Sequence, residues 1–513
     1  MRFPVISQII LSNVDDESLT NFKISSRENN NFLDNERFYW IRNIDKYSAN
    51  FEEFQEIWEK VISKTPVEFS KNLAIDVHRF FEGYTMGTDL GTQTCVPIFG
   101  LRYLEQWHPL FIGAERGSLP LCVHIVERTG DVNPKIQSIQ YDGFTPLGFA
   151  AQEGHLEICA FLTKHLDDKN PGDDNGWTPL HSAAQKGHLE VCKLLFNHLD
   201  NKNPGANDGW TPLHSAAAKG HLEICKLLFN HLDNKNPRTD IGWTPLHSAA
   251  KKGHLEICAL IIENIVNQHP ADDNGRTPLY LAAENGHVEI YKQLMQDLDN
   301  KNPSRTGGWT SLHSAAKNGH LEVCEVIMQY LVNKNPACNS GCTPLHLAAE
   351  NGHLEICEAI MRKLVEKNPG NNLGWTPLHE AASNGHFEIC KALMENLHDK
   401  NPKDDRGKTP LHEAVIIPSN LDLDAKQGYL ATCKLLMENF DNKSLKDNRG
   451  QTPLHAAAIQ GDLDACKEMI EFFDDIHPRD NEGLTPLDWA SRMDDMEVYE
   501  LISNHPKNSQ IKN

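Results

Sequence analysis

Hydrophobic positions recur along most of the chain in a pattern of two short helices. In one copy, Thr178-Pro179 opens an apolar stripe that ends before Gly187, and a second amphipathic run extends from Leu189 to Leu199. A threonine hydroxyl can cap a helix, proline fits the first helical position, and glycine suits the left-handed residue after the last turn. Each copy therefore predicts a helix pair, with a tight hairpin turn at Asp208-Gly209 before the next pair.

The pattern has a fixed period. The tetrad Thr-Pro-Leu-His begins at Thr178, Thr211 and Thr244, at intervals of 33 residues. Related tetrads begin at Thr145, Thr277, Thr310, Thr343, Thr376, Thr409, Thr452 and Thr485. In length and motif these units resemble ankyrin repeats. The resemblance implies an all-α solenoid of stacked helix pairs with projecting hairpin fingers, in which each unit is stabilised by its neighbours.

The array is expected to cover residues 107–504 in about twelve repeats. His108-Pro109-Leu110, with Gly117 and Cys122 in phase, indicates a divergent first repeat. At the other end, Asp488 replaces the tetrad histidine and Asp494 the turn glycine, which suits a solvent-facing cap. Residues 505–513 are polar and predict a disordered tail.

Two features depart from common ankyrin sequence. The usual glycine after the second helix is missing, so we expect that helix to run one or two residues longer until Pro204 of Lys202-Asn203-Pro204 stops it. The Lys-Asn-Pro step belongs to this array's own design, because it recurs at Lys235, Lys301, Lys334, Lys367 and Lys400. The second departure is an insertion at residues 416–427, which predicts a tolerated surface loop between the two helices of its repeat.

The first 47 residues differ from the array. Phe3-Pro4, an Ile-Leu pair and a terminal Tyr39-Trp40 lie in the order of an F-box, which this helical segment resembles. The F-box docks on the adaptor subunit of cullin–RING ubiquitin ligases, and the resemblance implies docking by Pro4, Ile9, Ile10, Leu11 and Leu19. Phe3, Ser25 and Asn29 depart from the F-box pattern. The alternative for this segment is a helical cap or an unrelated adaptor-docking fold. In either case we expect a helical connector at residues 48–82 and a linker at residues 83–106.

Composition limits the classes of partner. The 513 residues carry a formal net charge of −22, which argues against nucleic acid or an acidic membrane, although acidity also keeps a long array from self-associating. The chain has no 18-residue apolar run, and its N-terminus does not resemble a secretory signal. We expect a cytoplasmic or nuclear protein that is monomeric before it binds its partner.

Most of the thirteen cysteines share one position of the second helix, on its apolar face. They are Cys159, Cys192, Cys225, Cys258, Cys324, Cys357, Cys390, Cys433 and Cys466. Stacked helices lie about 8–10 Å apart, whereas the Cα atoms of a disulfide lie within about 7 Å. We therefore predict buried, reduced thiols in an intracellular protein.

Histidines are abundant, but their phase explains most of them. One set closes the tetrads and comprises His181, His214, His247, His313, His346, His379, His412 and His455. The ankyrin resemblance implies that these rings form local hydrogen bonds and do no chemistry. Cys338 and Cys342 lack a second ligand pair at zinc spacing, and no phosphate loop or nucleophile motif occurs. We expect no metal, no cofactor and no enzymatic activity.

The residue before the tetrad is a repeated tryptophan at Trp177, Trp210, Trp243, Trp309 and Trp375. The resemblance places this row on the concave side, where ankyrin proteins hold protein partners, and aromatic anchors dominate binding energy. Alternatively, each tryptophan packs on the neighbouring finger, and both roles can hold. Two hypotheses follow. The chain is either a substrate receptor of a cullin–RING ligase or a non-catalytic scaffold whose N-terminal helices only cap the array.

Overall fold

The computed structural model describes residues 109–135, 143–296, 298–439 and 445–507. These ranges are helical, and their only bridge is an isolated antiparallel one between Ser304 and Thr310. The chain divides into two units, Met1–Asp240 and Ile241–Asn513. No helix in the described ranges is long and apolar enough to span a membrane.

Each repeat contributes an odd-numbered first helix and an even-numbered second helix. The first helices are α7 (Pro109–Arg116), α9 (Pro146–Glu153), α11 (Pro179–Lys186), α13 (Pro212–Lys219), α15 (Pro245–Lys252), α17 (Pro278–Glu284), α19 (Ser311–Lys317), α21 (Pro344–Glu350), α23 (Pro377–Ser383), α25 (Pro410–Ala414), α27 (Pro453–Gln460) and α29 (Pro486–Arg492). The second helices are α8 (Leu119–Thr129), α10 (Leu156–His165), α12 (Leu189–Asn197), α14 (Leu222–Phe229), α16 (Leu255–Ile262), α18 (Val288–Leu294), α20 (Leu321–Tyr330), α22 (Leu354–Met361), α24 (Phe387–Asn396), α26 (Leu423–Glu438), α28 (Leu463–Phe472) and α30 (Met496–Ser503).

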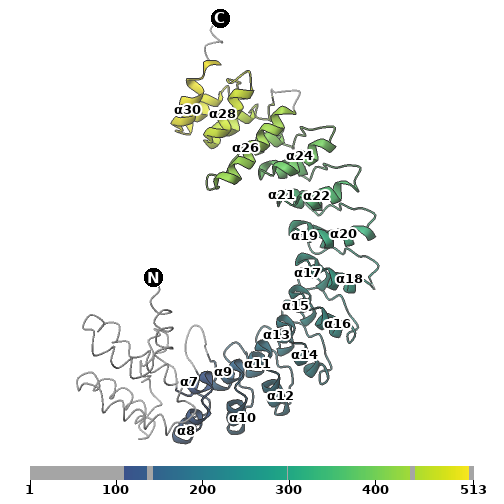
Figure 1. Cartoon of the computed structure of the whole chain (residues 1–513), viewed down its shortest axis with the longest axis vertical. Coiled ribbons are helices and arrows are strands. Elements are labelled where there is room, and N and C mark those ends of the chain that lie inside the picture. Colours follow the sequence, from purple (N-terminus) through teal and green to yellow (C-terminus); the bar gives the residue numbers. More distant parts are fainter. Residues whose placement is uncertain (1–108, 136–142, 297, 440–444, 508–513) are drawn as a thin grey trace, which may run out of the picture. The chain divides into compact units, whose positions relative to one another are not determined.

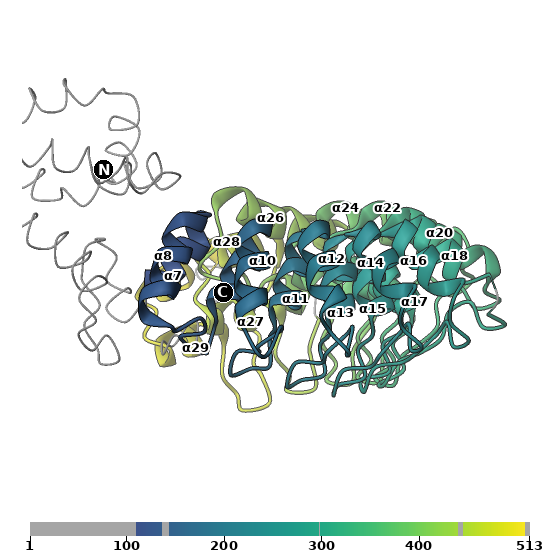
Figure 2. The ribbon, with the colours of Figure 1, turned by 90° about the horizontal axis from the view of Figure 1, so that it is seen from below.

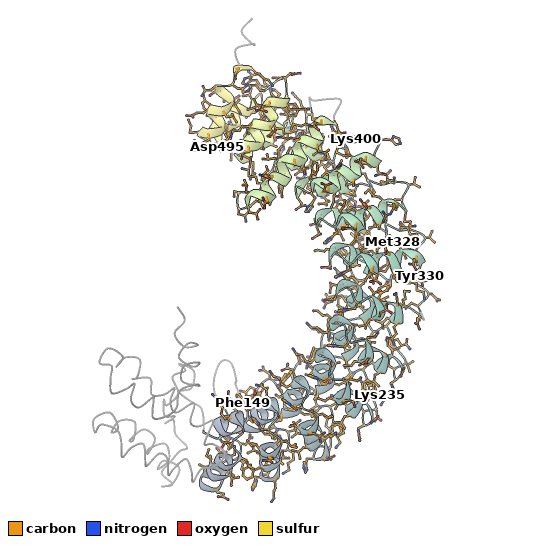
Figure 3. All side chains as sticks on the ribbon, viewed as in Figure 1. Phe149, Lys235, Met328, Tyr330, Lys400 and Asp495 are labelled. Carbon is orange, nitrogen blue, oxygen red and sulfur yellow. The ribbon has the colours of Figure 1, made fainter. Side chains whose placement is uncertain are left out.

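Within each unit the helices form two layers, which confirms the stacked helix pairs. Odd-numbered helices pack on the next odd-numbered helix, and even-numbered helices on the next even-numbered one (Figure 1). The loops between repeats project to one side of each stack and form the fingers (Figure 2). Tyr330, at the end of α20, lies on the even-numbered side and is 54% exposed (Figure 3). The core between the layers consists mainly of leucines, isoleucines, cysteines and the alanines that follow each tetrad, such as Ala183 and Ala184.

The predicted ends of the first helix are confirmed. The Thr178 side chain and that of His181 form a capping box at the start of α11, and Pro179 occupies its first position. At the other end, Gly187 is left-handed, with φ of 88°, and its N–H donates to the Ala183 carbonyl oxygen. A glycine is required there for a second reason. A Cβ on Gly187 would lie 2.5 Å from the ring of His221 in the next repeat.

The fingers are tight hairpin turns closed by glycine. The Gly209 N–H donates to the Ala206 carbonyl oxygen (2.9 Å), and the Ala206 N–H donates to that of Trp210 (2.7 Å). Gly209 has φ of 79°, whereas the two residues before it keep negative φ values. This is a three-residue loop with a left-handed final residue, for which glycine has the lowest cost.

The prediction that Pro204 stops the second helix is wrong. Helix α12 ends at Asn197, and the His198 N–H donates to Leu195 in a closing turn. The Lys202 ammonium then binds the carbonyl oxygen of Phe196, so the lysine of the Lys-Asn-Pro step caps the helix that precedes it. The asparagine serves the next helix. Asn203 Oδ1 accepts from the N–H of Leu213 in α13 at 3.0 Å.

The insertion is only partly a loop. Helix α25 ends early, at Ala414, and the chain then buries Ile417. Part of the inserted sequence lengthens the second helix, because α26 begins at Leu423, and the Asp422 side chain caps it by accepting from the N–H of Ala425 (2.9 Å). Lys426 of this extension forms an ion pair with Asp464 of the next repeat (2.8 Å). The prediction of a simple surface loop at 416–427 was therefore wrong for its second half.

The last repeat has the polar end that was predicted. Asp488 takes the place of the tetrad histidine and accepts from the Thr485 N–H at 2.8 Å, while Asp494 is exposed. The predicted disorder from 505 is wrong at its start, since Lys507 donates to the carbonyl oxygens of Ile470 (2.6 Å) and Phe473 (2.7 Å). It caps α28 in the way that Lys202 caps α12. Residues 508–513 lie outside the described residues.

The N-terminal predictions lie outside the described residues. They comprise the F-box-like segment at 1–47 with its docking residues, the connector at 48–82 and the linker at 83–106. The docking residues are Pro4, Ile9, Ile10, Leu11 and Leu19. The described residues begin with the helix pair α7–α8, at the place where the sequence predicted the divergent first repeat.

Candidate protein-binding surface

The tryptophans lie at the base of the fingers and contact their own repeats. Trp177 Nε1 donates to Ser182 Oγ (3.1 Å), and its ring centroid lies 4.8 Å from that of His181. Trp210 makes the same bond to Ser215 (2.9 Å). These indoles are half-buried, so contacts within the repeat account for part of each ring, and packing on the neighbouring finger stays a prediction.

The other tryptophans vary in their contacts. Trp243 is 9% exposed, bonds Ser248 Oγ (2.8 Å) and lies under the guanidinium of Arg276. Trp375 instead donates Nε1 to Asp404 Oδ2 of the next finger (3.2 Å). Trp309 and Trp375 are separated by the finger that carries Cys342, so the second unit has no continuous aromatic strip between them. Trp177 and Trp210 do lie on consecutive fingers.

The tetrad histidines connect consecutive repeats, and their tautomer follows from the geometry. His181 Nδ1 accepts from the Thr178 N–H (3.1 Å), so that nitrogen carries no proton. Nε2 therefore holds the proton and donates to the Trp210 carbonyl oxygen (3.0 Å) in the next finger. The ring is completely buried, and burial lowers the pKa of His181 to about 4. The predicted local hydrogen bonding is confirmed.

A second set of histidines connects each repeat to the one before it. His188 Nε2 bonds the Gln152 carbonyl oxygen (2.9 Å), and His221 bonds that of Gln185 (3.1 Å). Each ring lies over the turn glycine of the preceding repeat. Within each unit, repeats that carry both histidines are thus joined in both directions, which holds their surfaces in place.

The cysteines of the second helices are buried with free thiols. Burial raises the pKa of Cys192 and of Cys225 to about 12, which leaves the thiols protonated and unreactive. Among the described residues, no three histidine, cysteine or acidic side chains converge as a metal site. Cys338 contacts Ser340 (3.1 Å) and Cys342 contacts Asn371 (3.5 Å).

The exposed fingertips differ from repeat to repeat although the buried residues are the same. The position three residues before the tetrad threonine is exposed in every described finger. It holds Asn175, Asp208, Ile241, Asn274, Gly307, Ser340, Leu373, Arg406, Arg449 and Glu482. Sequence reasoning missed this position, although the change of residue type at fixed phase could have revealed it. We call the exposed fingertips, together with the exposed residues of the odd-numbered helices, the finger face.

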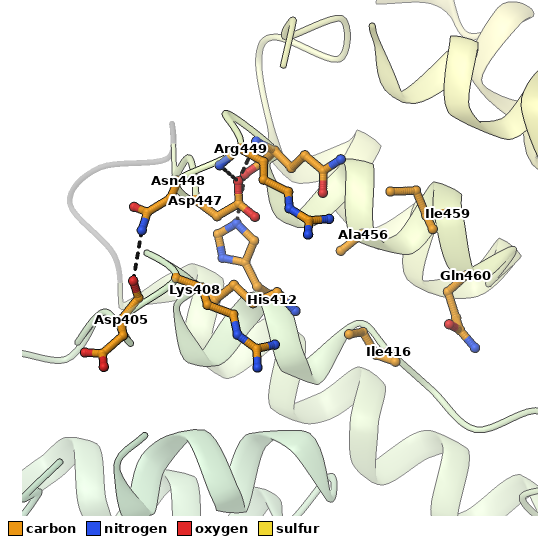
Figure 4. Close-up of a pocket in the computed structure, with 12 residues that line it drawn as sticks. Asp405, Lys408, His412, Ile416, Asp447, Asn448, Arg449, Ala456, Ile459 and Gln460 are labelled. Carbon is orange, nitrogen blue, oxygen red and sulfur yellow. Dashed lines mark hydrogen bonds between the residues drawn. The ribbon is translucent and has the colours of Figure 1, made fainter. Parts of the chain in front are cut away.

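One part of the finger face is hollowed. A cavity of about 590 Å³ lies between the fingers that precede Thr409 and Thr452 (Figure 4). Its wall includes Arg406, Arg449, Ile416, Ala456 and Ile459. None of these residues was a candidate in the sequence.

Comparison with known families agrees with the geometry. The family model described as ankyrin repeats (3 copies) matches in overlapping segments that together cover residues 110–419 and 421–513. The chain belongs to the ankyrin-repeat family. A comparison with curated proteins returned no match. The ankyrin match begins at residue 110, so it lends no support to the F-box resemblance of residues 1–47.

Proposed function

We propose that this ankyrin-repeat protein is a non-catalytic scaffold that binds a segment of a partner protein along its finger face. The observation that carries the proposal is the contrast between the repeated buried residues and the varied exposed fingertips. Packing requirements explain the repeated residues but not the variation of an exposed position. Variation on a repeated support is what selective recognition of one partner needs.

The fingers are held rigid, which favours tight binding. The Asn207 N–H donates to the Asn175 carbonyl oxygen (2.9 Å), and Asn207 Nδ2 donates to that of Asp174 (2.9 Å). In the second unit, Asn372 bonds the preceding finger in the same way, to Ser340 and Asn339. A surface that is already ordered loses little conformational entropy when it binds.

Tryptophans are part of this proposal. All of them except Trp243 are half-buried and so remain partly exposed near the variable fingertip, and a partly exposed aromatic ring on a fixed support is a good anchor for a partner. The binding residues proposed here are Trp177, Trp210, Trp243, Trp309 and Trp375. Trp243 contributes least, because it is the most buried of the five.

A matched pair of variants tests the proposal. Peptides selected from a display library on the full chain should lose affinity for Leu373→Asp, because Leu373 is a 59% exposed fingertip of the finger face. Val365→Asp is the control, since Val365 is fully exposed in the same unit but lies in the loop after α22. Equal loss with both variants, or loss with Val365→Asp alone, would reject the finger face as the binding surface.

The narrower proposal is that the scaffold is a substrate receptor of an F-box-type cullin–RING ubiquitin ligase. Its support is the order of residues in the first 47 positions. Purified adaptor subunit should bind the full chain, and Ile9→Asp with Leu19→Asp should abolish this binding, because an apolar docking contact does not tolerate two buried charges. If the adaptor does not bind, the N-terminal segment is a cap and the array is a scaffold alone.

A further inference from the structure

The cavity on the finger face exists because two repeats lack the residues that fill this place elsewhere. Where five other repeats have tryptophan before the tetrad, these two have Lys408 and Gln451. Lys408 turns to Glu413 and forms an ion pair at 2.9 Å. Ala456 stands where Trp177 and Trp210 find their serine partners, so neither a ring nor its hydroxyl occupies the space.

The inner wall of the cavity is apolar. Ile416 and Ile459 occupy the same phase of consecutive repeats, seven residues after the tetrad threonine, and both are half-buried. Figure 4 shows these two side chains and Ala456 on the side of the first helices. Other repeats have polar residues at this position, such as Gln185 and Lys317. The pair of isoleucines is therefore not required by the ankyrin packing.

The outer wall carries two arginines on consecutive fingertips. Arg406 and Arg449 are exposed at equivalent positions, and in the described part of the chain neither guanidinium forms an ion pair with a carboxylate. Two acidic residues line the same cavity, and one of them, Asp405, is exposed beside Arg406. The Asp447 carboxylate accepts from the N–H groups of Arg449 (2.9 Å) and Gln451 (2.8 Å) in its own finger.

We propose that this cavity binds a peptide segment in which acidic residues flank a bulky apolar residue. The apolar side chain enters between Ile416 and Ile459, and the flanking carboxylates bind the guanidinium groups of Arg406 and Arg449. Charge complementarity favours an acidic segment, since two exposed arginines lie on consecutive fingertips and neither forms an ion pair with a described carboxylate. The volume of about 590 Å³ accommodates one large side chain with its flanking backbone. The proposal rests on the scaffold function above and adds the chemistry of the partner.

The test uses a fluorescent peptide with one leucine flanked on each side by two glutamates, and the full chain. Arg406→Asn with Arg449→Asn should weaken binding at least about tenfold, because each charge-assisted bond lost is worth a factor of that order. Asparagine is chosen because Asn175 and Asn274 occupy the same fingertip position, so the fold tolerates it. The control, Arg362→Gln with Lys391→Gln, removes the same charge from the second-helix side of the same unit and should leave affinity unchanged.

The apolar wall has its own test. Ile416→Gln with Ile459→Gln introduces the residue type that another repeat has at this position, Gln185. The double change should lower the affinity for the peptide at least about tenfold. A peptide with glutamine in place of each glutamate should bind the normal chain weakly. Its affinity should match that of the original peptide for the chain with Arg406→Asn and Arg449→Asn. A peptide with serine in place of leucine should bind the normal chain and the chain with Ile416→Gln and Ile459→Gln with the same affinity.

Several results would overturn the proposal. These are no binding of the acidic peptide, equal affinity for the chain with Arg406→Asn and Arg449→Asn, and binding only when phosphoserine replaces glutamate. Displacement of the peptide by a single-stranded oligonucleotide of higher affinity would do the same. If library peptides still bind and depend on Leu373, the cavity proposal fails and the scaffold function stands. If neither class of peptide binds the finger face, both fail.

Discussion

Acid should weaken the contacts between consecutive repeats through the tetrad histidines, and His346 shows why. Its Nδ1 accepts from the Thr343 N–H (3.2 Å), and its Nε2 donates to the Trp375 carbonyl oxygen (3.0 Å). Burial lowers the pKa of His346 from 6.5 to about 4. Protonation of Nδ1 would place two donors face to face and a charge in the core, so the folded array keeps the ring neutral.

The direction and size of the effect follow from these values. Above pH 6.5 the ring is neutral in both the folded and the unfolded chain, and its full stabilising contribution is present. As the pH falls from 6.5 towards 4, the unfolded chain takes up the proton first, and stability is lost. For one such ring the loss between pH 7.5 and pH 5.5 is about 1.4 kcal/mol.

The assay is urea unfolding of the full chain at both pH values, followed by helical circular dichroism. His346→Gln should be less stable at pH 7.5, because glutamine keeps an acceptor for the Thr343 N–H but forfeits the bond to the next finger. Between pH 7.5 and pH 5.5 the free energy of unfolding of His346→Gln should fall by about 1.4 kcal/mol less than that of the normal chain. His398→Gln is the control, since His398 is exposed in the same unit. Identical acid losses for His346→Gln and the normal chain would refute the reasoning.

Three further predictions concern single positions. Lys507→Met should destabilise the last repeats by about 1–2 kcal/mol in thermal unfolding, because it removes the cap on α28, whereas Lys507→Arg should retain most of it. Asp494→Gly should stabilise the chain by up to about 1 kcal/mol, because Asp494 has φ of 57°, and Asp494→Ala should bring no gain. Thiols such as Cys192 should react with a thiol reagent only after unfolding, since each is buried and protonated at neutral pH; rapid reaction of the folded chain would contradict the core position.

Local rules predicted much of this structure. Thr178, Pro179 and Gly187 mark helix ends because a cap, a fixed φ and a left-handed turn are properties of a few neighbouring residues. The 33-residue phase then placed all the tetrad histidines correctly. The proline rule failed at Pro204, because the helix already ends at Asn197, where Lys202, six residues after Phe196, binds the Phe196 carbonyl oxygen.

Predictions also failed where tertiary contacts decide. The insertion carries loop-forming residues, yet it lengthens α26, whose Lys426 finds acidic partners in the following repeat. Lys507 belongs to a polar tail, but the carbonyl groups at the end of α28 hold it in place. The repeat phase places Arg406 and Arg449 on consecutive fingertips, but the cavity was not predicted, because its volume depends on how the side chains of two repeats pack.

Binding of a partner to the finger face is tested most directly by hydrogen exchange on the full chain, with and without a selected peptide. Binding should slow exchange in the fingers and first helices of contiguous repeats, for example at residues 371–383 and 404–414. Exchange in the second helices α22 and α24 should stay unchanged. Protection confined to second helices, with unchanged exchange in the fingers, would contradict the finger face as the binding surface.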